Sequence, residues 1–259
     1  MTMLPNDHAP PEKSEPDDLG AAVSKSSGRP PSLNLVPLMR KVEKTAWGFV
    51  LRCLESEKRE SLCLPVPIER WIEGPLNLRL EVADLSKFAP AGHEVLGMAI
   101  YSTRTIRVSH RIVDQENRYR FTIAHELGHL ALHGHLSGSY RDSTDGAYLD
   151  AVVEREADKF AAAFLVPANA FRQELPRITA YCGFEAAQFL EQVSNEDSAA
   201  TAIFLNEVVP RISRRFGVAK TTALGRFRDL QIDGTRPMVP HRILQQLHKR
   251  LDGKRGTSE

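Results

Sequence analysis

The sequence has few cysteines and no long hydrophobic run. Its 259 residues include three cysteines, Cys53, Cys63 and Cys182, which are too few and too widely spaced for a disulfide framework or a CxxC metal knuckle. An apolar stretch of about 18 residues, as a membrane span requires, is missing. Residues 1–30 also lack the apolar segment of a secretory signal. These absences exclude disulfide-rich and membrane classes and predict a cytoplasmic protein.

Positive charge is concentrated near the C-terminus. The net charge is only +1, but residues 211–259 contain twelve Arg and Lys against four Asp and Glu. Residues 1–210 carry seven more acidic than basic side chains. A basic segment of this kind fits nucleic acid or an acidic partner surface, and it is also typical of a solvated helical face.

Composition divides the chain into three parts. Seven of the sixteen prolines fall within residues 1–37, among Ser, Glu, Asp and Gly. Residues 1–36 are therefore predicted to form a disordered tail, because they contain little that could be buried. We expect one domain over residues 37–180 and a helical C-terminal domain over residues 181–259.

Hydrophobic periodicity predicts an α+β fold. The expected elements are a helix over residues 37–56, a strand over 76–82, a hairpin over 96–109, and two helices over 117–134 and 150–165. The hairpin predicts a small antiparallel sheet, because its β-branched residues alternate on either side of a polar turn. The rest of the chain is expected to be helical.

Residues 120–129 contain the motif HExxH within an amphipathic helix. His125 and His129 are four residues apart and so lie about 40° apart around the helix axis, which lets both imidazoles face one ion. Glu126 lies roughly 100° from His125, too far round to be a ligand but well placed to take a proton from water at that ion. Catalytic zinc takes three protein ligands and keeps one open position, so a third ligand must come from another segment.

Two segments offer the third ligand, and they imply different enzyme classes. His135 stands at the last position of the metzincin pattern, but Leu132 replaces the glycine at which that helix breaks, so we expect the helix to continue and to turn His135 away. Glu154 instead fits the gluzincin pattern, in which a residue four positions later, here Asp158, supports a histidine ligand through a hydrogen bond. We predict Glu154 as the third Zn²⁺ ligand, with Glu156 as the alternative if the helix is rotated.

Three segments follow one another in a characteristic order. They are the hairpin strand Gly97–Tyr101, the motif helix Arg120–His133, and Glu154–Pro167, which ends in Leu-x-Pro. This order resembles the ImmA/IrrE family of bacterial metallo-endopeptidases, over about residues 40–180. The resemblance implies a zincin-like peptidase domain with a small antiparallel sheet and the HExxH helix, followed by a helical, helix-turn-helix-like region.

The resemblance also implies roles for individual residues. Zinc would be held by His125, His129 and Glu154, with Glu126 as the catalytic base. Asp158 stands where the family often has asparagine, a departure that removes no ligand. Family members typically cleave helix-turn-helix transcriptional repressors and so release genes for stress responses or for transfer of mobile elements. The resemblance implies a protein partner of that class here.

The oxyanion of a peptide cleavage reaction needs a hydrogen-bond donor that the motif does not supply. The candidates on or near the segment between the two helices are His133, His135, Tyr140 and Tyr148. His133 also lies in register with the two motif histidines and fits a packed core position equally well. The sequence leaves this choice open.

The segment 208–231 has the pattern of a helix, a glycine turn and a second helix. It fits a DNA-binding helix-turn-helix that presents Lys220, Thr221, Thr222 and Arg226 to the groove. It fits a packing or substrate-docking module equally well.

Two functions from different classes follow from these patterns. The first is a zinc endopeptidase that cuts a regulatory protein. The alternative is a non-catalytic DNA-binding or protein-binding regulator that retains a peptidase-like fold. The intact Glu126 favours the enzyme, because a relic has no need for a base beside the metal.

Overall fold

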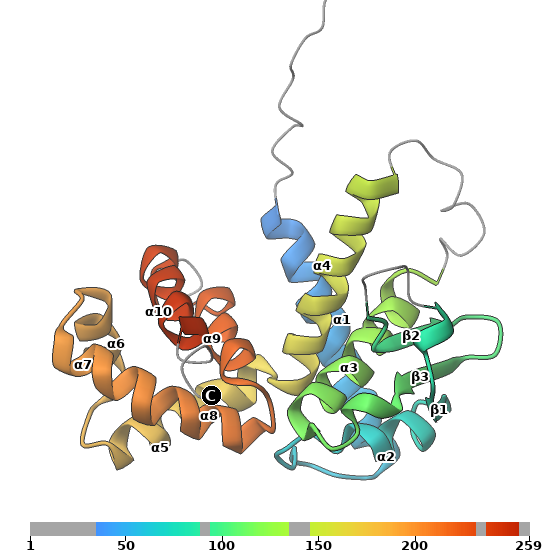
Figure 1. The fold of residues 1–259 in the computed structure, drawn as a ribbon. Helices are drawn as coiled ribbons and strands as arrows, with labels where there is room; N and C mark the ends of the chain where they lie inside the picture. The colour runs from blue at the N-terminus through green and yellow to red at the C-terminus, as the bar shows by residue number, and fades with distance from the viewer. Residues whose placement is uncertain (1–34, 89–93, 135–145, 232–236, 254–259) are drawn as a thin grey trace, which may run out of the picture. The chain divides into compact units, whose positions relative to one another are not determined.

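The computed structural model describes residues 35–88, 94–134, 146–231 and 237–253, and Leu35–Glu259 form one compact unit. The fold is α+β (Figure 1). Its main elements are α1 (Leu35–Ser56), α2 (Ile68–Glu73), β1 (Arg79–Ala83), β2 (Gly97–Ile100), β3 (Thr105–Ser109), α3 (Glu116–Leu132), α4 (Gly146–Leu165), α5 (Ala168–Tyr181), α6 (Ala186–Ser194), α7 (Ser198–Ile203), α8 (Val209–Phe216), α9 (Lys220–Asp229) and α10 (His241–Gly253). The described residues also include two 3₁₀ turns, η1 (Ser86–Phe88) and η2 (His110–Ile112), and a π-helical segment, η4 (Phe204–Val208).

Several predicted elements are confirmed, with shifted ends. The helix expected from residue 37 begins at Leu35, and the one expected from residue 150 begins at Gly146. The motif helix ends at Leu132, so the expectation that it continues beyond this residue is wrong. The predicted tail lies almost entirely outside the described residues. Among the helices that are described, none combines the length and apolar character needed to cross a membrane.

The sheet contains the expected hairpin but is not purely antiparallel. Its strand order is β1-β3-β2, and β2 pairs with β3 antiparallel, as predicted. In contrast, β1 pairs with β3 in parallel, with Arg79 opposite Thr105. The chain passes from β1 to the far edge of the sheet before the hairpin returns it to the centre, so β3 runs in the direction of β1. The sheet is therefore mixed.

The helices α1, α3 and α4 pack together beside the sheet (Figure 1). Each contributes apolar side chains to one core, among them Val50 of α1, Leu127 of α3 and Phe160 of α4. Gly128 sits where α3 meets α4: a Cβ atom there would lie 3.1 Å from the Cα of Ala157. The absence of a side chain at Gly128 thus lets α4 approach the motif helix closely, which brings the segment with Glu154 and Asp158 to the HExxH face.

The predicted helix-turn-helix is present. α8 and α9 are joined at Gly217, whose φ of 61° lies in the left-handed region that favours glycine. The apolar side chains that we expected to pack together are all fully buried, namely Ile212, Phe216, Val218, Leu224 and Phe227.

Arg226 is not presented to a DNA groove, and that expectation is wrong. Its side chain is 1% exposed. The guanidinium donates to both carboxylate oxygens of Glu43, at 2.9 and 2.7 Å, and to the carbonyl oxygen of Val166 at 3.0 Å. A buried arginine needs such partners, because an uncompensated buried charge is strongly destabilising. Arg226 therefore fixes α9 to α1 and to the end of α4.

Candidate metal centre

The motif helix places both histidines on one face, and α4 brings a carboxylate to them. The Nε2 atoms of His125 and His129 lie 3.0 Å apart. Glu154 reaches the first with Oε2 at 3.2 Å and the second with Oε1 at 3.3 Å. These three side chains form a group whose ligand atoms lie within 4.8 Å of one another. They come from segments 25 residues apart, so the packing of α3 against α4 builds the group.

The donor set fits zinc in both chemistry and spacing. Zinc bound tetrahedrally at about 2.0–2.1 Å requires ligand atoms about 3.3 Å apart, close to the separations of 3.0 to 3.3 Å observed here. Two imidazoles and one carboxylate leave the fourth position free for water or substrate. The side chain of Glu154 is 59% exposed, so the group is reached from solvent on the α4 side.

Asp158 holds the first histidine in the orientation that a metal ligand needs. Its Oδ1 lies 2.9 Å from Nδ1 of His125. The carboxylate can only accept here, so the proton sits on Nδ1 and the lone pair on Nε2 is left for the ion. This is the contact that the ExxxD spacing predicts, although the role of Asp158 in metal binding stays a prediction.

His129 has its own chain of supporting contacts, which the sequence did not reveal. Its Nδ1 lies 3.3 Å from Nδ1 of His133, and Nε2 of His133 lies 2.8 Å from Oε2 of Glu156. The Glu156 carboxylate accepts from Nε2–H of His133, so Nδ1 of His133 accepts from Nδ1–H of His129. Once a metal ion takes the place of a proton on Nε2, that order leaves the Nε2 lone pair of His129 for the ion. Glu156, our alternative ligand, is thus engaged away from the metal group.

His133→Phe is expected to weaken zinc binding about 10–100-fold, the usual cost of losing an outer partner of a metal ligand. The ring of Phe fills the buried space of His133, which is 4% exposed, but it accepts no hydrogen bond from His129. The measurement is a zinc titration of the full chain against a chelator of known affinity. Asp158→Ala, which removes the acceptor beside the other histidine, is the matched comparison and should weaken binding to a similar degree. Unchanged affinity in His133→Phe would leave His133 as a packed core residue only.

Glu126 is buried beside the sheet rather than joined to the metal group. It is 7% exposed, and the backbone N–H of Ala99 in β2 donates to its carboxylate. Burial raises the pKa of this carboxyl, against the lowering effect of the two motif histidines. A Cβ at Gly97 would collide with the Glu126 carboxylate and lie 2.6 Å from Thr122 Cγ2. Gly97 therefore leaves the space in which Glu126 stands.

The pKa values of His125 and Glu154 are shifted by the hydrogen bonds between imidazoles and carboxylates in the metal group. Burial by itself lowers the pKa of His125, but the hydrogen bonds with Asp158 and Glu154 outweigh it and raise that pKa to about 10. Hydrogen bonds from His125 and His129 hold the pKa of Glu154 well below its usual range. In the metal-free chain the carboxylates therefore retain a proton on His125, which a metal ion must displace.

The structure also presents a residue near the site that sequence reasoning missed. Tyr101 follows β2, and its hydroxyl donates to the carbonyl oxygen of His129 at 3.3 Å. Burial raises the pKa of this phenol, and the charges of Glu126 and Glu154 raise it further. The only signal in the sequence was its position at the end of the hairpin strand that precedes the motif.

The oxyanion candidates predicted from sequence have mixed outcomes. His133 is described, and both of its ring nitrogens lie in hydrogen-bond distance of other side chains. His135 and Tyr140 lie outside the described residues, and so does the side chain of Tyr148.

Comparison with known proteins finds a family model that is similar to the segment carrying this group. The family model of the IrrE N-terminal-like domain, Peptidase_M78, matches residues 77–181. No curated protein matches the sequence. Among solved structures, a Mycobacterium tuberculosis transcriptional regulator matches with a TM-score of 0.45 and 18% identity, over 76% of this chain and 49% of that one, so this chain spans about half of its length. The segment that is similar to the IrrE N-terminal-like domain, residues 77–181, includes the HExxH motif and Glu154.

Proposed function

We propose that this chain is a zinc-dependent endopeptidase that hydrolyses a peptide bond in a regulatory protein, with a helix-turn-helix repressor as the substrate. One observation carries the proposal: the ligand atoms of His125, His129 and Glu154 converge at zinc spacing, with the buried Glu126 next to the first of them on the same helix. The substrate class, a stress-response role, a cytoplasmic location and the division into domains at residues 180 and 181 belong to the same proposal and rest on sequence resemblance and pattern.

Each residue of the site has a separate role in the proposed peptide hydrolysis. When bound, zinc supplies Lewis-acid chemistry that acidifies water and polarises a carbonyl group. Glu126 takes a proton, and the burial that raises its pKa makes its carboxylate a stronger base near neutral pH. The same carboxyl then returns the proton to the amine that leaves. With metal bound, Asp158 and His133 would hold the remaining proton of each imidazole on Nδ1, which leaves Nε2 for the ion.

Tyr101 is the residue that we assign to the oxyanion. The phenol is protonated at neutral pH, and the upward shift of its pKa keeps it so, which leaves its O–H available as a donor. With no substrate present the hydroxyl donates to the carbonyl of His129 at 3.3 Å, a long hydrogen bond. A substrate oxygen near Glu126 and Glu154 therefore competes with a weak partner for this donor.

Tyr101→Phe is expected to lower kcat about 10²-fold, with little change in zinc affinity, because a single oxyanion donor contributes on that order. The substitution removes only the hydroxyl and keeps the ring. Steady-state cleavage of the substrate, together with zinc analysis of the same preparation, separates the two effects. Tyr119→Phe, which removes the hydroxyl of another half-buried tyrosine on α3, is the control and should keep the wild-type rate. A Tyr101→Phe variant with the wild-type kcat contradicts the assignment.

The proposed function is tested by incubating the zinc-loaded full chain with a set of purified helix-turn-helix repressors, with casein as an unrelated protein. Discrete repressor fragments, lost with a chelator and restored by zinc, are the expected result. If the zinc-loaded chain cuts none of the repressors, the substrate assignment is wrong. If it cuts neither repressors nor casein, the endopeptidase proposal itself is contradicted and the binding-only regulator takes its place.

A further inference from the structure

We propose that the groove between α3–α4 and α9–α10 binds an acidic segment of the protein substrate. The inference rests on the proposed function, since it names the class of substrate sequence that the peptidase takes. It is carried by three features of the described residues: the position of the groove beside Asp158, its surplus of unpaired cations, and the buried anchors that fix its two walls.

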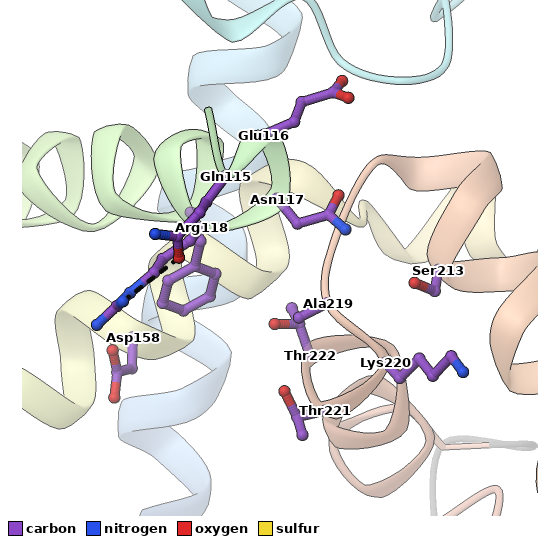
Figure 2. Close-up of a pocket in the computed structure, with 11 residues that line it drawn as sticks. Gln115, Glu116, Asn117, Arg118, Asp158, Ser213, Ala219, Lys220, Thr221 and Thr222 are labelled. Atoms are coloured by element: carbon purple, nitrogen blue, oxygen red, sulfur yellow. Dashed lines mark hydrogen bonds between the residues drawn. The ribbon is translucent and has the colours of Figure 1, made fainter. Parts of the chain in front are cut away.

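The groove consists of two adjoining pockets with volumes of about 1090 and 800 Å³. Both are lined by Phe121, Asp158, Thr221 and Thr222, so they form one continuous depression. Figure 2 shows the first pocket, with the N-terminal end of α3 and Asp158 on one side and residues 219–222 on the other. This space accommodates several side chains of an extended polypeptide, which advances about 3.3–3.6 Å per residue.

The groove starts one helical turn from the metal group. Asp158 lies four residues beyond Glu154 on α4, so the two side chains share a face of this helix. Asp158 lines both pockets and also contacts His125. A polypeptide whose scissile bond lies at Glu154 therefore enters the groove within a few residues if it follows α4.

The charges that line the groove favour an acidic occupant. Arg155 of α4 and Lys220 of α9 line it and are exposed, and over the described ranges neither has a salt bridge. Five Arg and Lys side chains line the groove against three acids. Asp158 contacts His125, and Asp229 pairs with Lys159 and Arg228, whereas Glu116 is exposed and has no salt bridge over the described ranges. The positive charge that remains is complementary to Asp and Glu side chains.

The two walls are held at a fixed spacing by buried contacts. Arg120 of α3 donates to the carbonyl oxygen of Gly217 at 3.1 Å, and Arg226 of α9 donates to that of Val166 at 3.0 Å. Lys159 of α4 pairs with Asp229 of α9, and burial is the main cause of a lowered pKa at this lysine. A preformed groove loses less conformational freedom on binding than a mobile one.

The same contacts argue for a polypeptide over duplex DNA. A recognition helix must project from its domain to enter a major groove about 12 Å wide. Here Thr221 and Thr222 face the pocket opposite α3 and Asp158 (Figure 2), and Arg226 is buried against Glu43. Two of the residues that a DNA-reading helix would present, Thr221 and Thr222, therefore face the peptidase elements, and a third, Arg226, is buried.

The test is fluorescence anisotropy of the full chain with three labelled probes: a Glu-Ala repeat peptide, a Lys-Ala repeat of equal length, and a short DNA duplex. We expect the acidic peptide to bind in a salt-dependent manner. The double variant Arg155→Glu/Lys220→Glu should bind it at least tenfold more weakly. Lys41→Glu/Arg214→Glu, which changes the same charge at exposed positions outside both pockets, should bind it like the wild type.

Failure of the inference is distinguishable from failure of the proposed function, because binding is measured without cleavage. No binding of the acidic peptide, or equal loss in both double variants, overturns the groove assignment even if repressors are cut. Binding of the duplex in place of the acidic peptide, lost in Arg155→Glu/Lys220→Glu, overturns it in favour of nucleic acid. Acidic-peptide binding that depends on Arg155 and Lys220 supports it even if no protein is cut.

Discussion

Glu126→Gln should abolish cleavage while the chain keeps its metal and its fold. Gln has the size of Glu and fills the same space beside Gly97, but its amide accepts no proton at neutral pH. General-base catalysis contributes about 10²–10⁴ to the rate, so we expect kcat to fall by that factor. His125, His129 and Glu154 are untouched, and zinc content should stay at one ion per chain. Cleavage kinetics and metal analysis of one preparation give both values.

The environment of Glu126 explains why the loss should lie in catalysis rather than stability. Gln retains an oxygen that accepts from the N–H of Ala99, and an uncharged side chain costs less to bury than a carboxylate. The midpoint of thermal unfolding should therefore stay the same or rise. A variant that cuts at the wild-type rate would remove Glu126 from the mechanism, and one that loses zinc would show that it acts on the metal group instead.

The sequence predicted the metal group because its information is local. His125 and His129 are fixed on one face by the helical repeat alone, and so are Glu154 and Asp158 on the second helix. The hairpin was also predictable, since alternating side chains and a short polar turn determine both strands. In each case the interacting residues are a few positions apart, and the geometry of one element decides the outcome.

What the sequence did not predict depends on contacts between distant segments. The pairing of β1 with β3 in parallel follows from the path of the chain between them, which no local pattern records. The burial of Arg226 depends on Glu43, which lies 183 residues away. Tyr101 meets His129 across 28 residues. These contacts were inaccessible because composition and periodicity describe one element at a time.

The contact between His129 and His133 was only partly predictable from the sequence. The spacing placed both rings on one face of α3, so their proximity was predictable from the helical repeat. The partner that decides the role, Glu156, lies on α4, and its contact with His133 depends on how α4 is rotated against α3. That rotation also decides between Glu154 and Glu156 as the metal ligand, since the two carboxylates lie about 200° apart around the α4 axis.

Glu154→Ala and His129→Ala should each lose the metal, and with it all cleavage. Removing a ligand leaves two protein donors, so we expect zinc affinity to fall by more than the roughly 10–100-fold cost of an outer partner. Chelator-competition titration of both variants and of His133→Phe gives their three zinc affinities by the same measurement. His133→Phe should fill with zinc when the metal is in excess, whereas the two ligand variants should stay below one ion per chain.

Glu156→Ala is the control that separates the two acids of α4. It removes the partner of His133 but leaves the group of His125, His129 and Glu154 complete, so its affinity should match that of His133→Phe. If Glu154→Ala instead keeps zinc and Glu156→Ala loses it, the third ligand is Glu156 and α4 binds metal in a different rotation. Since one helix face cannot present both carboxylates to one ion, each result excludes the other assignment.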